Sequence, residues 1–474
     1  MSAGICIMNK NAIALAADSA VTIGQHLAIH NSANKLFALS KVAPIGVIIY
    51  SNAELMGVPM ELIIKQYKSE LRNKVFPNLS DYVTDFLKFL ILKSDLFHFP
   101  TNEKSYVTNV YVDLLNGLNG DYQLSIKRKI NEVKRDLIAE ELQEIQVETV
   151  KATLMFVDQL AVIPNLELHD YIKDTYGGEI RQYISAHFPW IGKPLLTELV
   201  EKICFVYNKD FMRNGYVGLA FAGYGENNIF PQMLHLHISG IANNIIRYTT
   251  IENVAITEEQ MSAIIPLAQT DVMQTFLFGI NDSFINGIGE ELPRQIQSGV
   301  NSIDDTFFAE NKKQSVQQEL SRITSNVINQ IVQKAQQQYL LPITQSVATL
   351  PIEELALLAE SMINITSLWR KVALDNNIGT VGGPIDVAII SKCDGFIWLK
   401  RKHYFDRAYN PQYFYSHYML SESEDSRKHR RCCHGAASAE FAEPLHLNSP
   451  ALAADSVPYS MFFWKSKFTP PFVV

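Results

Sequence analysis

The first hundred residues change from a strand-like to a helix-like hydrophobic pattern. Apolar residues alternate with small ones over residues 4 to 17, and Asn9-Lys10-Asn11 interrupts the run, which predicts a β-hairpin. "KLFALSK" and "PIGVIIY", between residues 35 and 50, predict a second strand pair. From Glu54 to about Leu96 apolar residues recur every three or four positions, which predicts two helices separated at Pro77.

The rest of the chain alternates between helical and strand-like segments. Amphipathic helical patterns run over residues 100 to 210, roughly 284 to 340, and 351 to 373. Strand character returns in "GYVGLAFAGYG", in residues 233 to 250, and in a closing pair that turns at Asp394-Gly395. This order predicts an α+β fold with two antiparallel sheets covered by helices.

These patterns predict a core in three parts. We expect it at residues 1–98, 214–283 and 341–410, with helical insertions at 99–213 and 284–340. The polar helix of the first insertion is expected to pack one face against its neighbours, with a partner-binding coiled coil as the alternative. Residues 411–474 lack a sustained periodicity, so we expect a loosely ordered C-terminal extension there.

Charge and cysteine content narrow the possible environments. A formal net charge of -8 argues against a broad electrostatic contact with nucleic acid or anionic lipid. Five scattered cysteines do not resemble a secreted disulfide framework and favour a reducing compartment. No apolar run approaches the roughly 18 residues that a membrane span needs. We therefore expect a cytoplasmic protein with neither nucleic acid nor membrane as a partner.

Common cofactor and metal motifs are missing from the sequence. It contains no GxxxxGK[ST], HExxH, GxSxG or paired-cysteine zinc pattern, so no cofactor and no metal are expected. Two weaker metal alternatives remain. His235 and His237 share one face of a predicted strand, and Cys432-Cys433-His434 are adjacent, but neither set brings enough ligands at a suitable spacing.

Ser2 is a candidate nucleophile because of its position in the chain. A serine hydroxyl needs a base, and the α-amino group of a first residue, with a pKa of about 8, can take that role. Met1 would have to be removed, which a small residue at position 2 permits. Many ordinary proteins also carry serine there, so the neighbouring residues decide the interpretation.

The opening stretch "SAGICIMNKNAIALAADSAVTIG", followed by "ANKLFAL", resembles the proteasome β-type family of N-terminal-nucleophile hydrolases. That family has a nucleophile, a strand, a turn, a strand ending in Ala-Ala-Asp-Ser, and then a lysine. The whole pattern looks like a bacterial stand-alone, proteasome-like protein. The resemblance extends at lower specificity to "YVGLAFAGYGENNIFP" and "TVGGPIDVAIISKCDGF", covers somewhat under half the chain, and implies an αββα four-layer sandwich with large helical insertions.

The resemblance also implies a set of site residues. Ser2 would be the nucleophile, with Asp18 sixteen residues later and Lys35 thirty-three residues later as the supporting pair. The backbone N–H of Tyr50 or Ser51 would form the oxyanion hole. Where the family has a glycine at that turn, this chain has Tyr50, which we expect to obstruct the backbone approach. The alternative for Asp18 and Lys35 is a polar strand end with a surface ion pair.

The leading hypothesis is a proteasome-like hydrolase of the N-terminal serine or threonine type. Its expected substrate is an amide bond in a peptide or protein, and we expect a homo-oligomer. One alternative is a non-catalytic proteasome-fold protein that serves in assembly or interaction. Another is an N-terminal-nucleophile hydrolase that acts on a small amide.

Overall fold

The structure is a computed structural model that describes residues 3–23, 28–212, 215–303, 312–372, 381–403, 405 and 408–414. The chain comprises two units, Met1–Tyr413 and Phe414–Val474. The predicted C-terminal extension lies outside the described residues, apart from the short helix α12, Pro411–Phe414.

The first sheet is built around the N-terminal hairpin. In the described part of the chain it has five strands in the order β12-β1-β2-β13-β14, and all neighbours are antiparallel. The strands are β1 (Ala3–Asn9), β2 (Ala12–Ala17), β12 (Ser262–Ala268), β13 (Asp386–Ser391) and β14 (Gly395–Lys400). The predicted hairpin and closing strand pair are confirmed. Strand β12 was not predicted, although it pairs with β1 along its whole length.

The second sheet contains the other predicted strands. Among the described residues its order is β11-β10-β9-β6-β5, again antiparallel throughout. The strands are β5 (Leu36–Ala38), β6 (Ile45–Ser51), β9 (Val217–Gly223), β10 (Gln232–Ala242) and β11 (Ile245–Ala255). Asn243 and Asn244, both with positive φ, make the tight turn between β10 and β11, as hairpin turns require. Two short ribbons, β3 (Val21–Ile23) with β4 (Ala28–His30) and β7 (Glu54–Leu55) with β8 (Val58–Pro59), complete the strands.

The two sheets share one apolar core, and β2 shows how the sequence alternation builds it. Ile13 and Leu15 belong to this shared core together with Ile48 and Ala222 of the second sheet. The alternate residues of β2 are alanines that face the opposite side and pack with helix α11. Small side chains on that face let a helix approach closely. Both faces of β2 are therefore buried.

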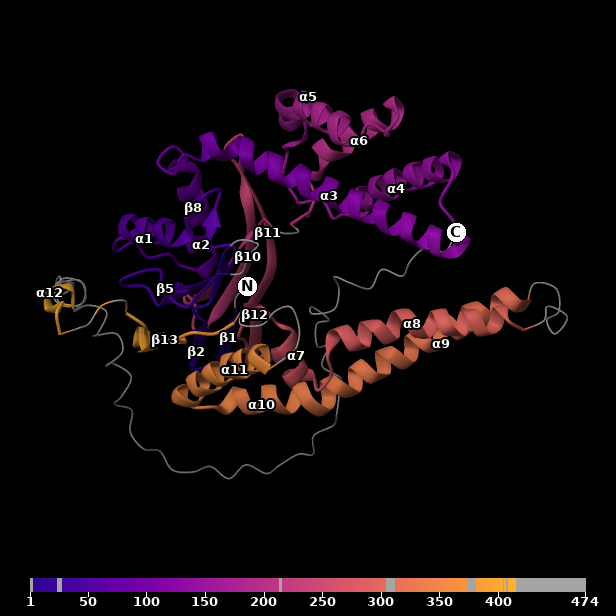
Figure 1. Ribbon diagram of the computed structural model, residues 1–474. Helices are drawn as coiled ribbons and strands as arrows, with labels where there is room; N and C mark the ends of the chain where they lie inside the picture. Colours follow the sequence, from indigo (N-terminus) through magenta and orange to yellow (C-terminus); the bar gives the residue numbers. More distant parts are fainter. Residues whose placement is uncertain are drawn as a thin grey trace. The chain divides into compact units, whose positions relative to one another are not determined.

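Helices pack on the outer side of each sheet (Figure 1). Helices α1 (Met60–Leu71) and α2 (Leu79–Leu92) share an apolar core with the second sheet. Helices α7 (Asp271–Phe278), α10 (Leu341–Thr349) and α11 (Ile352–Val372) share one with the first sheet. A π-helical turn, η2 (Gln336–Leu340), leads directly into α10. The result is a mixed α and β architecture with antiparallel sheets.

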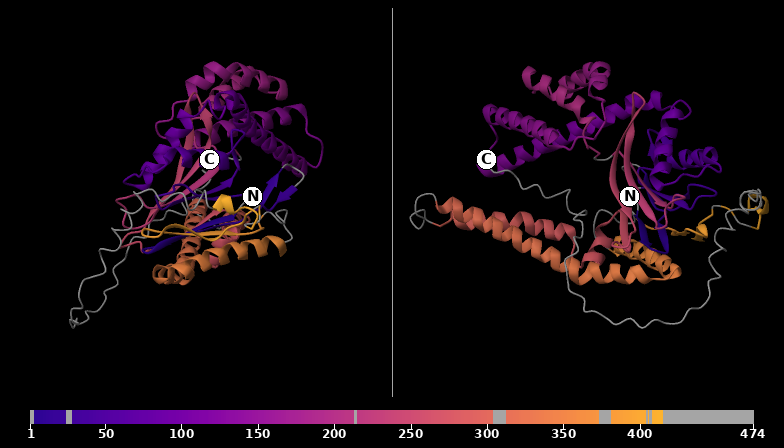
Figure 2. Two further views of the ribbon diagram at one scale, coloured as in Figure 1. Left: turned by 90° about the vertical axis from the view of Figure 1, so that its left-hand side faces the viewer. Right: turned by 180° about the vertical axis from the view of Figure 1, so that it is seen from behind.

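Two further groups of helices extend the chain. Helices α3 (Phe99–Val133), α4 (Ala139–Gln159), α5 (His169–His187) and α6 (Lys193–Val206) share a separate apolar core. Helices α8 (Asp282–Asn301) and α9 (Lys312–Ala335) run side by side (Figure 2). None of the helices in the described ranges has the length and apolar content needed to cross a bilayer.

Candidate active site

Asp18 ties the beginning of β1 to two later segments of the chain. It follows β2 directly, and its Oδ1 accepts a hydrogen bond from the backbone N–H of Ala3 at 2.9 Å. Its Oδ2 accepts from the N–H groups of Ala20 at 3.2 Å and Gly382 at 3.1 Å. The side chain is completely buried, so these donors replace the water that a carboxylate would otherwise need.

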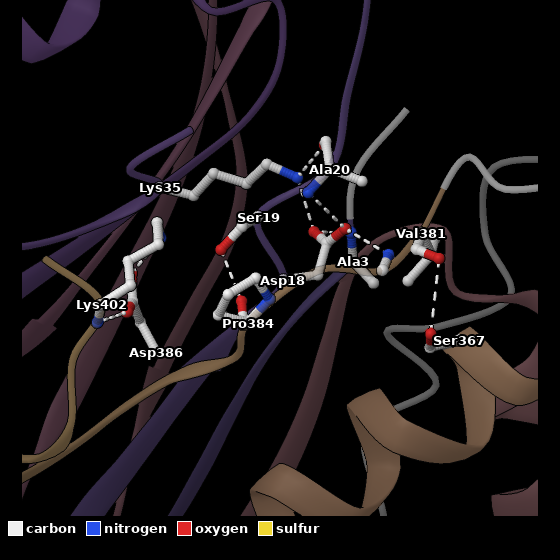
Figure 3. A network of polar contacts seen from close by, with 11 residues as sticks. Ala3, Asp18, Ser19, Ala20, Lys35, Ser367, Val381, Pro384, Asp386 and Lys402 are labelled. Atoms are coloured by element: carbon white, nitrogen blue, oxygen red, sulfur yellow. Dashed lines mark hydrogen bonds and ion pairs between the residues drawn. The ribbon is translucent and has the colours of Figure 1, made fainter. Parts of the chain in front are cut away.

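Lys35 completes this network just before β5. Its Nζ lies 2.5 Å from Oδ1 of Asp18 and 2.5 Å from the carbonyl oxygen of Ala20 (Figure 3). Its own carbonyl accepts from the N–H of Ile49 at 2.8 Å, which fixes Lys35 against β6. Only 3% of Lys35 is exposed, so the interpretation of a surface ion pair is wrong.

Burial and charge act in opposite directions on Lys35. Burial lowers its pKa below the ordinary value, and the Asp18 carboxylate opposes that shift through its charge and its hydrogen bond. Lys402 lowers the pKa of Lys35 further; its own ammonium pairs with Asp386. A carboxylate and a carbonyl as partners of Nζ suit a donor, which is what an ammonium provides.

The structure therefore brings together two of the three predicted catalytic side chains. Asp18 and Lys35 are in direct contact, next to the amide of Ala3. Ser2, the predicted nucleophile, lies outside the described residues, as do Cys432, Cys433 and His434. The Gly382 amide and the Ala20 carbonyl complete the network. Gly382 lies in the stretch "TVGGPIDVAIISKCDGF", which the sequence resemblance included without giving it a role, and a backbone carbonyl such as that of Ala20 can come from any residue type.

The two predicted oxyanion donors lie on opposite edges of β6. Ile49 donates its N–H toward Lys35, on the β5 side. N–H groups alternate between the two edges of a strand, so the Tyr50 N–H points toward its partner Gly218 in β9, and the Ser51 N–H points toward the β5 side. Ser51 also has a positive φ of 66°, which marks the end of the regular strand. Of the two candidates, Ser51 has the amide that faces the same edge as Lys35.

The side chain of Tyr50 does not behave as expected. Its ring lies across the α-carbon of Gly218, where a Cβ would come within 2.2 Å of the ring. Its hydroxyl contacts Nε2 of His235 and lies 2.6 Å from Nε2 of His237. Only 5% of Tyr50 is exposed. The predicted obstruction is therefore wrong, because the ring turns into the core between the sheets and the missing side chain of Gly218 makes room for it.

The surroundings of Tyr50 keep both histidines neutral. Burial lowers the pKa of His235 to about 3, with a further contribution from His237, and burial lowers the pKa of His237 to about 4. Glu252, opposite His235 in the sheet, has its pKa raised to about 7 by burial. The shared face of His235 and His237 was visible in the sequence, but their common partner Tyr50 was not. In the part of the chain that is described, no three His, Cys, Asp or Glu side chains converge on a metal position.

Lys35 lines a cavity of about 730 Å³. Tyr50 and Ser51 also line it, as do residues of helix α3 that include Asn102, Ser105 and Asn109. This volume falls within the range of small-molecule sites. The arrangement therefore combines a buried lysine–carboxylate pair, a backbone edge with a candidate donor, and space for a ligand.

Comparisons with known proteins identify no family for this chain. No protein-family model and no curated protein matches the sequence. The chain is similar to an Anbu mutant from Hyphomicrobium sp. strain MC1, with 8% identity, a TM-score of 0.27, and coverage of 94% of this chain and 100% of that one. It is also similar to Anbu from Yersinia bercovieri, described as an ancestral beta-subunit, with 8% identity, a TM-score of 0.25, and coverage of 93% and 100%. A helical assembly of the Anbu complex from Pseudomonas aeruginosa gives 7% identity, a TM-score of 0.25, and coverage of 93% and 98%.

These findings correct the predicted family. The prediction that the chain is a stand-alone member of the proteasome β-type family is wrong, because no family model matches it and the similar solved structures are Anbu proteins at very low identity. At TM-scores this low, the likeness carries no argument about activity. The case for a function therefore depends on the site geometry alone.

Proposed function

We propose that this chain is an N-terminal-nucleophile hydrolase that cleaves amide bonds in peptides, with Ser2 as the first residue of the active form. One observation carries the proposal. Oδ1 of Asp18 accepts both the Lys35 ammonium at 2.5 Å and the backbone N–H of Ala3 at 2.9 Å. Ala3 is covalently bonded to Ser2, so the supporting pair is anchored to the residue that follows the proposed nucleophile.

The proposed reaction uses the α-amine of Ser2 as general base. This amine accepts the proton of Oγ while Oγ attacks the substrate carbonyl, and it returns the proton to the leaving amine. The charge of Lys35 favours an unprotonated α-amine and stabilises the developing alkoxide, while Asp18 holds Lys35 in position. Water then hydrolyses the ester on Oγ and regenerates the hydroxyl.

The backbone N–H of Ser51 is the proposed oxyanion donor. It faces the β5 edge that also carries Lys35, whereas the Tyr50 N–H faces β9. One well-placed donor of this kind contributes about 3 to 4 kcal/mol to the stabilisation of a tetrahedral intermediate. We retain Tyr50 as a positioning residue, because its buried ring fixes the end of β6.

The layer arrangement of the proposed enzyme is an αββα sandwich. Three apolar cores support this arrangement. One core lies between the two sheets, a second joins the first sheet to its outer helices, and a third joins the second sheet to its own outer helices. The helices α3 to α6 and α8 to α9 are insertions in this scheme. Homo-oligomer formation and a cytoplasmic location stay predictions.

A non-catalytic interaction protein is the second candidate. Helix α9 leaves Ile323 and Val327 more than 40% exposed, with Ile331 one turn further on at 37%. Three apolar side chains at a spacing of four residues form a stripe that is suited to contact with another protein. This function would need neither a free α-amine nor Ser2.

Intact mass measurement and active-site labelling together test the proposal. We expect the purified protein to lack Met1, to carry no acetyl group, and to be labelled at Ser2 by a peptidyl acylating probe. Ser2→Ala should abolish the labelling, whereas Ser185→Ala, an exposed serine on α5, should leave it unchanged. A blocked N-terminus, or equal labelling of Ser2→Ala, would reject the hydrolase and favour the interaction protein.

A further inference from the structure

Helix α3 contributes a polar wall to the cavity that Lys35 also lines. Asn102, Ser105, Asn109 and Asp113 all line the cavity and follow one another at intervals of three and four residues. Residues at these intervals share one face of a helix. Ser51 at the end of β6 lines the same cavity, so the α3 face and the proposed oxyanion edge border one space.

Contacts of two residues of α3, Asn102 and Tyr106, hold this wall in place. Nδ2 of Asn102 donates to the carbonyl oxygen of Met56 in the β7–β8 turn at 2.8 Å. The hydroxyl of Tyr106 lies 3.0 Å from Oγ of Ser239, and its ring occupies the space where Gly240 has no Cβ, within 2.5 Å of that position. Contacts to two separate segments fix both the rotation and the distance of α3 relative to the second sheet.

The two cationic side chains that line the cavity, Lys35 and Arg247, have acceptors within the protein. Lys35 binds Asp18, and Arg247 is completely buried with neutral acceptors, which include Oγ of Ser239 and the carbonyl of Phe211. Ser105 and Asn109, by contrast, are exposed on the cavity side of α3. Amide and hydroxyl groups both donate and accept hydrogen bonds, so they complement a ligand that does the same.

We propose that α3 is the selectivity wall of the substrate site and that this wall favours peptides with uncharged polar side chains. This inference rests on the proposed function, since it assigns a substrate class to the same site. Acidic side chains are disfavoured because the Glu54 carboxylate lines the cavity, while Lys35 and Arg247 already bind acceptors of the protein. Ser105 and Asn109 act in binding and in no chemical step.

Peptide binding to the Ser2→Ala protein tests the inference without requiring hydrolysis. The probe is a fluorescein-labelled hexapeptide of alternating alanine and glutamine, measured by fluorescence anisotropy. We expect Asn109→Leu to weaken binding by about tenfold, because a hydrogen-bonding partner of the peptide is lost. Asn119→Leu, the same change at an exposed position of α3 that does not line the cavity, should have no effect.

A second comparison tests the ligand class directly. The glutamine peptide should bind at least about tenfold more tightly than its glutamate counterpart, because the amide side chains can bond to Ser105 and Asn109, whereas the carboxylates are repelled by Glu54. Equal binding of the two peptides, or equal binding by Asn109→Leu and the parent protein, would overturn the inference. If Ser2 is labelled but Asn109→Leu does not change peptide binding, the hydrolase proposal stands and the selectivity role of α3 is rejected. If Asn109→Leu weakens binding but Ser2 is not labelled, the selectivity role stands and the hydrolase proposal is rejected.

Discussion

The Nζ atom of Lys35 lies 2.5 Å from Oδ1 of Asp18, and neither side chain is more than 4% exposed. An ion pair in this setting is different from one on the surface, because each charge has lost its water and depends on the other. The Asp18 carboxylate also accepts hydrogen bonds from three backbone N–H groups, those of Ala3, Ala20 and Gly382. The pair is therefore a structural junction and also the centre of the proposed site.

We expect Lys35→Ala to lower the free energy of unfolding by roughly 3 to 5 kcal/mol, because it leaves the buried Asp18 carboxylate without its cation. Urea unfolding followed by circular dichroism measures this. Lys65→Ala is the control, since Lys65 pairs with Glu61 at an exposed position and its loss should cost about 1 kcal/mol or less. Similar losses in the two variants would contradict the role assigned to the buried pair.

The double variant Asp18→Asn with Lys35→Met separates stability from activity. Removing both charges avoids an unpaired buried ion, so we expect this protein to recover at least about 2 kcal/mol relative to Lys35→Ala. It should still fail to label Ser2, because the field of the ammonium is gone. Labelling at the parent rate in a folded double variant would exclude Lys35 from the chemistry.

Gly218→Ala should be strongly destabilising, because its Cβ would lie 2.2 Å from the ring of Tyr50. Moving the ring also breaks the contacts of its hydroxyl with two histidines, so we expect a loss of at least about 3 kcal/mol in thermal or urea unfolding. Gly120→Ala on α3 is the matched control, because nothing lies within 4 Å of the added methyl group, and it should stabilise by up to about 1 kcal/mol. Equal stability of the two variants would contradict the observed position of Tyr50.

Glu252→Gln should stabilise the protein at pH 8 and not at pH 4. Burial raises the pKa of Glu252 from 4.5 to about 7, so between these values the folded state holds a proton that the unfolded state has released. The free energy of unfolding therefore falls as the pH rises through this window and levels off above it. We expect a gain of roughly 2 kcal/mol for the variant at pH 8, measured by urea unfolding at a series of pH values.

Two controls belong to that experiment. Glu258→Gln, at an exposed position, should leave the pH profile unchanged. The lowered pKa values of His235 and His237 reduce stability as the pH falls below about 6.5, but they do so in both proteins and cancel in the difference. A Glu252→Gln gain that is equally large at pH 4 would point to packing instead of ionisation.

Arg247→Lys should loosen the segment that joins α6 to β9. The guanidinium donates to the carbonyl oxygens of Tyr207 at 3.1 Å, Lys209 at 2.7 Å and Phe211 at 2.7 Å from two different nitrogens. A single ammonium does not reproduce this geometry. We expect a loss of roughly 3 kcal/mol and faster limited proteolysis between Asn208 and Met212. Arg181→Lys on the exposed face of α5 should be cleaved at the parent rate.

The sequence alone predicted the strands whose hydrophobic alternation is regular and whose turns carry Asn, Lys or Asp-Gly. The N-terminal hairpin and the β13–β14 pair are of this kind, because local steric preferences and burial of one face act within a few residues. The sequence resemblance also selected Asp18 and Lys35 as a pair, and the two side chains are in contact in the structure. The family that the resemblance named was wrong.

Only the tertiary structure decided which distant segments complete these local units. Strand β12 pairs with β1 across more than 250 residues, Gly382 donates to Asp18, and Gly218 makes room for Tyr50. A hydrophobic pattern reports which face of a segment is buried, but not which other segment covers it. A backbone amide or an absent Cβ leaves even less trace, because its role depends on how close another part of the folded chain comes to it.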